Sequence, residues 1–271
     1  MRPKPPAAQP PCTPVPGAVA PRVAVYIHPT CATSYELVKR LASEGLLERV
    51  ELRDTSSPSE ALHQGVWSVP WILVDGQPAA TDPVEPGEAL EIITGAWSRS
   101  IANPAEAFME TVLHSAYAAA VAYLHGSLEP VLDEALASAA ARSPLSGIDP
   151  SKLLGEIRSN AEKLYREWED KIMRALGISF VREAWWASSG SLDRETLRNM
   201  ATPEAVGLWL IGKASIGRTG LPPKPLPSRE RLEKLASFIH RGAAGLLSRV
   251  KREQETILGD EEYWRILSRV L

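Results

Sequence analysis

Cysteine and side-chain amides are scarce in this sequence. Two cysteines, Cys12 and Cys31, stand among 271 residues, too few for a disulfide-dense secreted scaffold or for a zinc site built from cysteines. Three asparagines and four glutamines leave the chain poor in thermolabile amides, a composition that points to a hot habitat. Four histidines, His63, His114, His125 and His240, have no cysteine or carboxylate beside them at ligand spacing. We therefore expect no metal site, and the sequence indicates no cofactor.

Long apolar runs and a strong charge of one sign are also missing. The most apolar stretch, Thr111–Leu124, is shorter than the roughly 20 residues that cross a bilayer, and we expect one buried helix there. Residues 1–21 are rich in proline and lack the apolar core of a secretory signal, which predicts a flexible tail on a cytoplasmic protein. The formal net charge is −3, with basic residues scattered along the chain. These features argue against a nucleic-acid or membrane partner.

Short β-branched and aromatic runs alternate with helical periodicity between residues 22 and 98. A strand is expected at Val23–Ile27, ending at His28-Pro29, and a helix follows from about Ser34 to Gly45. Further along we expect, in order, a strand at Val50–Arg53, a short helix at Pro58–Gln64, a strand at Trp71–Val74, a turn at Asp75-Gly76, a strand at Gln77–Ala80 and a helix at Glu85–Ile93. The order predicts an α/β domain.

This β-α-β-α-β-β-α order resembles the thioredoxin fold, and it is most similar to the glutaredoxins. Two motifs carry the resemblance: HPTCATS, in which Cys31 and Ser34 form a CxxS version of the redox motif, and VPWILVDG. In that family the proline after the valine is cis and faces the active cysteine. The resemblance therefore implies that Val69 and Pro70 lie against Cys31.

Cys31 falls where a strand turns into a helix, a position suited to a nucleophilic thiol. Unpaired N–H groups and the helix dipole favour the thiolate there. Thr33 and Ser34 offer hydroxyl or backbone N–H groups to that thiolate, and His28 would stabilise it further if charged. We expect Cys31 and Ser34 to be the catalytic pair in thiol–disulfide exchange through mixed disulfides.

The resemblance also bears on how a substrate is held. The backbone of Val69 beside Pro70 would bind an extended substrate as an added strand, and Thr30, His28 and Asp82 are the remaining candidate binding residues. The expected partner is a protein or small molecule that bears a thiol or a disulfide. The sequence does not indicate an oligomeric state.

Ser34 stands where a dithiol enzyme has its resolving cysteine. A hydroxyl cannot displace a mixed disulfide, so two routes stay open. In one, an external thiol resolves the mixed disulfide; in the other, Cys12 is the resolving thiol, carried back by a tail long enough to reach Cys31.

Two other interpretations compete with a redox role. Cys31 is also explained as a small buried packing residue, in which case the thioredoxin-like part is a non-catalytic interaction module and the function lies in the helical part. The third interpretation is a glutathione-transferase-like enzyme, since that family also joins a thioredoxin fold to an all-helical domain. Asp82 fits its ligand-binding position, but Pro83 removes the hydroxyl and N–H of the serine found there.

Residues 99–271 show helical periods only, so we expect an all-α domain. We predict helices beginning at Asn103-Pro104, at Asp149-Pro150 and at Ser228, the second of them ending at Gly177. Other segments are a loop at Ser188–Ser191, a helical region at Arg194–Ile211, a linker over residues 212–227 and a terminal helix around Tyr263–Leu267. The linker lacks the glycine and lysine order of a phosphate loop.

Overall fold

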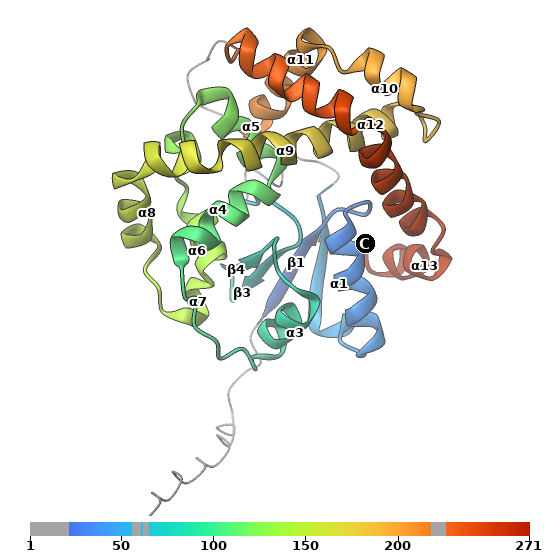
Figure 1. Ribbon diagram of the computed structural model, residues 1–271. Coiled ribbons are helices and arrows are strands. Elements are labelled where there is room, and N and C mark those ends of the chain that lie inside the picture. The colour runs from blue at the N-terminus through green and yellow to red at the C-terminus, as the bar shows by residue number, and fades with distance from the viewer. Residues whose placement is uncertain (1–21, 56–60, 62–64, 218–225) are drawn as a thin grey trace, which may run out of the picture.

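A computed structural model describes residues 22–55, 61, 65–217 and 226–271 (Figure 1). Cys12 lies outside this range, as do all of residues 1–21. The expected helix at Pro58–Gln64 also lies outside it, except for Ala61. Predictions made for those segments stay predictions.

Four strands form one mixed sheet in the order β2-β1-β3-β4. The strands are β1 (Val23–Ile27), β2 (Val50–Asp54), β3 (Trp71–Val74) and β4 (Gln77–Thr81). β1 runs parallel to β2 and antiparallel to β3, and β3 pairs antiparallel with β4. The turn between β3 and β4 holds Asp75 at φ 50° and Gly76 at φ 79°, which is the left-handed pair that an Asp-Gly hairpin requires.

Side-chain alternation along β1 divides the core between the two faces of the sheet. Val25 and Ile27 pack with α1 (Ala32–Ser43) and α3 (Pro86–Thr94). Tyr26, one position out of phase, belongs to the other core cluster, which the later helices supply. Because successive strand residues point to opposite faces, the sheet is covered on both sides.

The rest of the chain is helical, as expected for residues 99–271. Its helices are α4 (Pro104–His114), α5 (Ala116–His125), α6 (Glu134–Ala141), α7 (Ser143–Ser146), α8 (Pro150–Ser159), α9 (Ala161–Ala187), α10 (Arg194–Met200), α11 (Pro203–Gly217), α12 (Arg229–Leu258) and α13 (Glu261–Val270). Short 3-10 turns lie at Leu47–Arg49 and Glu129–Val131. α6 packs on β4, and α5 contacts α9 and α11. No helix of the described ranges combines the length and apolarity that crossing a membrane needs.

Two helix boundaries differ from the sequence prediction. The expected single helix over Thr111–Leu124 is interrupted at Ser115, whose hydroxyl accepts the N–H of Ala118 and so caps α5. The expected helix from Pro150 is interrupted at Asn160, which separates α8 from α9. A polar side chain that satisfies the backbone locally was enough to start a new helix at Ser115.

Gly177 does not end a helix, contrary to prediction; it lies inside α9. A Cβ atom at this position would stand 2.6 Å from the ring carbon Cδ1 of Phe238 on α12. The glycine therefore permits close approach of α9 and α12. From the sequence alone, a glycine that allows two helices to pack closely looks the same as a glycine that ends a helix.

The expected linker at residues 212–227 begins later than predicted. Gly212–Gly217 form the last turns of α11, and residues 218–225 lie outside the described part of the chain. The prediction that Ser228 caps the next helix is confirmed, since its side chain accepts the N–H of Arg231 at the start of α12.

The C-terminal helices return to the sheet. Tyr263 and Leu267 of α13, with Ile257 of α12, are buried in the same cluster as α1 and α3 (Figure 1). Tyr35 of α1 donates a 2.8 Å hydrogen bond to Asp260. Segments more than 200 residues apart thus share one core.

Candidate functional site

Cys31 is the N-cap residue of α1, at the end of the loop that follows β1. Its backbone is extended (φ −79°, ψ 127°), and its N–H donates to the carbonyl of His28 at 3.0 Å. The side chain is half-buried. The sulfur therefore lies at the positive end of the helix dipole.

Two groups contact the sulfur. The hydroxyl of Thr33 lies 3.1 Å from Sγ, and Sγ is 3.5 Å from the carbonyl oxygen of Val69, to which the thiol donates. The Val69–Pro70 peptide bond is cis. Val69 thus lies against Cys31, the juxtaposition that the resemblance to glutaredoxins implied.

Ser34 does not contact the sulfur. Its side chain is fully buried, and its hydroxyl accepts the backbone N–H of His28 at 3.4 Å. The expected pairing of Ser34 with the thiolate is therefore not found, and Thr33 supplies the hydroxyl instead. The reason is helical geometry: Ser34 faces inward toward the end of β1, whereas Thr33 stays on the side of the sulfur.

His28 turns toward Thr30 and not toward Cys31. Its Nδ1 accepts the N–H of Thr30 at 3.3 Å and lies 3.1 Å from the Thr30 hydroxyl. Burial lowers the pKa of His28 from its ordinary value, outweighing the opposite effect of Asp54. His28 is therefore mainly neutral near pH 7, and the expected role as a charged partner of the thiolate is not supported.

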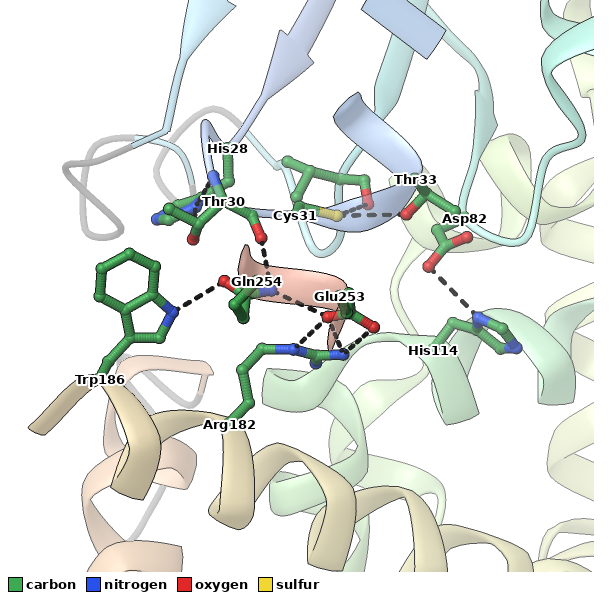
Figure 2. A network of polar contacts seen from close by, with 11 residues as sticks. His28, Thr30, Cys31, Thr33, Asp82, His114, Arg182, Trp186, Glu253 and Gln254 are labelled. Carbon is green, nitrogen blue, oxygen red and sulfur yellow. Dashed lines mark hydrogen bonds and ion pairs between the residues drawn. The ribbon is translucent and has the colours of Figure 1, made fainter. Parts of the chain in front are cut away.

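The Cys31 loop is held by residues from the far end of the chain. Gln254 of α12 donates to the carbonyl of Thr30 at 3.1 Å and accepts the indole N–H of Trp186 at 2.9 Å. Tyr263 of α13 donates to the carbonyl of Pro29 at 2.9 Å. Both side chains are fully buried, so they fix the loop that carries Cys31. Figure 2 shows Gln254 between Thr30 and Trp186.

Sequence reasoning missed these two supporting residues. Gln254 continues the apolar stripe of α12 four residues after Val250, and it is the polar member of that stripe. A polar residue on a buried face was the available signal. Nothing local to Tyr263 pointed to Pro29.

A cavity of about 1110 Å³ opens beside Cys31 and is walled by both parts of the protein. The sheet region contributes Thr30, Cys31, Val69 and Asp82, while the helices contribute residues of α4, α5, α9, α11 and α12. In Figure 2 the side chains of Asp82 and His114 lie on one side of Cys31, and the pair Arg182 and Glu253 lies across from it. The volume is ample for a small-molecule ligand.

Asp82 and His114 form a pair in the cavity wall. Asp82 is buried, and its Oδ2 lies 3.2 Å from Nδ1 of His114 on α4. This hydrogen bond raises the pKa of His114 against the opposing effect of burial. Within the described residues, the second oxygen of Asp82, Oδ1, is buried without a hydrogen-bond partner. The candidate binding residue Asp82 therefore borders the cavity with one oxygen bonded to His114 and the other buried.

No group of three or more histidine, cysteine or acidic residues is placed to hold a metal ion in the part of the chain that the structure describes. Cys31 is the free cysteine there, and the candidate resolving thiol Cys12 lies outside it. Comparison with protein-family models, with curated proteins and with solved structures finds no match for this chain.

Proposed function

We propose that residues 22–98 form a thioredoxin-like domain of the glutaredoxin type and that the protein performs thiol–disulfide exchange at Cys31. The strand order, with β1 parallel to β2 and antiparallel to β3, supports this fold. The observation that carries the function is the placement of Cys31: an N-cap thiol beside a cis Val69–Pro70 bond, at the wall of a large cavity. Residues 99–271 would form the all-helical domain that completes the cavity.

The proposed reaction has two exchange steps. In the first, the Cys31 thiolate attacks one sulfur of a substrate disulfide. The substrate S–S bond breaks, a Cys31 mixed disulfide forms, and the other substrate sulfur leaves as a thiolate that takes a proton from water. In the second, the thiolate of an external small thiol attacks the substrate sulfur of the mixed disulfide and releases Cys31 as a thiolate. A further small thiol then reduces the resulting disulfide, so two external thiols supply the two electrons.

The hydroxyl of Thr33 takes the role of thiolate stabiliser in this scheme, because it is the side-chain hydroxyl that contacts Sγ and it would donate to a thiolate. Val69 would offer its backbone to an extended substrate. Thr30 and His28, whose side chains contact each other in the cavity wall, would shape the site as neutral groups. Asp82 would border the site through its pair with His114.

The test is turnover of hydroxyethyl disulfide with a small thiol as reductant. We expect Cys31→Ser to abolish the protein-dependent rate and Thr33→Val to lower it. A full rate in Cys31→Ser would refute the proposal. Cys12→Ser distinguishes the two routes of resolution: an unchanged rate supports the external thiol, and a large loss supports Cys12.

A second candidate, a glutathione-transferase-like enzyme, is favoured by the cavity volume and by its walls from both parts of the protein. In such an enzyme a bound thiolate displaces a leaving group from an electrophile. This candidate predicts that millimolar glutathione raises the melting temperature of Cys31→Ser protein. Absence of a shift would count against it without affecting exchange at Cys31.

A further inference from the structure

One face of α9 lines the cavity for most of its length. Residues from Lys171 to Trp186 contribute at helical spacing, among them Arg174, Ile178 and Arg182. Since an α-helix rises 1.5 Å per residue, this face extends about 22 Å. The cavity therefore reaches well beyond the few ångströms that a reacting disulfide occupies.

Basic side chains outnumber acidic ones in the cavity wall, and each acidic side chain already has a partner. The pairs are Asp82 with His114 at 3.2 Å, Glu183 with Lys213 at 2.6 Å and Glu253 with Arg182 at 2.9 Å. Lys213 and Arg182 match the charges of Glu183 and Glu253, and His114 matches that of Asp82 when it is protonated.

Three basic side chains of the wall form no ion pair with an acid of the described residues: Lys171 and Arg174 of α9 and Arg249 of α12. All three are exposed, and Arg174 also interacts electrostatically with Asp170. The ammonium group of Lys171 lies 3.7 Å from the ring centroid of Trp168, a contact that orients the charge without cancelling it. The nearby acid Asp170 is bonded to Lys234 at 2.6 Å. The helical wall therefore carries an excess of positive charge.

We propose that Lys171, Arg174 and Arg249 form an anion subsite that binds a carboxylate or phosphate group of the substrate. Guanidinium groups bind both anions through paired N–H donors. The inference rests on the proposed function, because it assigns the subsite to the substrate of Cys31. It makes the helical wall the part of the cavity that selects negatively charged thiols and disulfides.

The first test compares three small disulfides that differ mainly in charge: 3,3′-dithiodipropionate (anionic), hydroxyethyl disulfide (neutral) and cystamine (cationic). We expect kcat/KM to fall in that order, with roughly tenfold between the first two at low salt, the effect of one charge-assisted contact. Added salt should reduce the difference. Equal rates, or a preference for cystamine, would overturn the proposal.

Charge reversal locates the subsite. Arg174→Glu with Arg249→Glu should remove the preference for the anionic disulfide over hydroxyethyl disulfide. Arg252→Glu is the matched control, since Arg252 is an exposed arginine of α12 outside the cavity wall. If the charge-reversed double variant does not fold, the neutral double variant Arg174→Gln with Arg249→Gln is used in its place. A preference that survives in a folded double variant contradicts the assignment.

Direct binding separates this inference from the redox proposal. Calorimetry on Cys31→Ser protein with 3,3′-dithiodipropionate and with pyrophosphate should show binding that the double variant loses, and the tighter probe identifies a carboxylate or a phosphate as the preferred anion. If the probes bind but the unmodified protein shows no exchange activity, the proposed function is refuted and the subsite is still supported. If neither probe binds, or if the double variant binds equally, the subsite does not exist.

Discussion

The sheet region and the helical region supply different chemistry to one cavity. Residues 22–98 provide the sulfur of Cys31 and the uncharged groups around it, the Thr33 hydroxyl and the Val69 carbonyl. Residues 99–271 provide the charged wall, and through Gln254 and Tyr263 they also hold the loop that carries the sulfur. Under the proposed function, the first region supplies the reacting group, and the second selects the substrate and positions the reacting loop.

The largest expected effect is on stability, through the packing of α9 against α12 in the helical region. Gly177→Ala should destabilise the protein by about 1–2 kcal/mol, because a Cβ atom 2.6 Å from the Phe238 ring forces α9 and α12 apart. Gly245→Ala is the control in α12: a Cβ there meets nothing within 4 Å, so it should stabilise by about 0.5–1 kcal/mol. Urea unfolding measures both. Equal effects would mean that Gly177 has no packing role.

The next largest effect is expected from loss of the contact between α13 and the Cys31 loop. Tyr263→Phe keeps the buried ring and removes the hydroxyl that bonds Pro29, at a cost of about 1 kcal/mol. We expect the alkylation rate of native Cys31 to change as well. Tyr35→Phe removes only the bond to Asp260, so it should leave that rate unaltered; a change of the same size in both variants would argue against positioning by Tyr263.

Two histidines sharpen the comparison, since one belongs to each region and their pKa values move in opposite directions. The hydrogen bond to Asp82 raises the pKa of His114, whereas burial lowers the pKa of His28. The His114 contribution to stability is therefore present below the unfolded pKa of about 6.5 and lost as pH rises through the higher folded value. The His28 contribution is present above about 6.5 and lost as pH falls through the lower folded value.

Proton NMR of the two imidazole rings checks this prediction. We expect His28 to titrate at lower pH than His114. Asp82→Asn should move the His114 titration downward and leave His28 in place. Superimposable titration curves in the unmodified protein would show that the two sites do not differ.

The smallest expected effect belongs to the Thr33 hydroxyl. Thr33→Val removes the group 3.1 Å from Sγ and should slow alkylation of Cys31 at pH 7 by a few-fold, on the order of one weak hydrogen bond. Ser34→Ala is the comparison, because Ser34 bonds His28 and not the sulfur. A larger loss of reactivity in Ser34→Ala would reverse these roles.

Local signals made the sheet region easy to predict. The strand at Val23–Ile27 and the Asp75-Gly76 turn depend on neighbours in the sequence, and both were found as expected. The cap at Ser228 belongs to the same class. Such features are set by backbone hydrogen bonding within a few residues.

The misses share a different cause. Gly177 was taken for a helix stop because the reason for a glycine there, Phe238, lies about 60 residues away on another helix. The choice between Thr33 and Ser34 as the partner of the sulfur depended on which side of α1 faces the core. The charged wall of the cavity is assembled from α9 and α12, and periodicity alone does not show which helices face one another.

The most direct test of the central claim is intact-mass analysis of the native protein after brief reaction with one equivalent of hydroxyethyl disulfide, followed by peptide mapping. The account predicts a single mixed-disulfide adduct on Cys31, absent in Cys31→Ser and reversed by a small thiol. A native Cys31 that stays unmodified while the unfolded protein reacts would contradict it, and Cys31 would then be a packing residue.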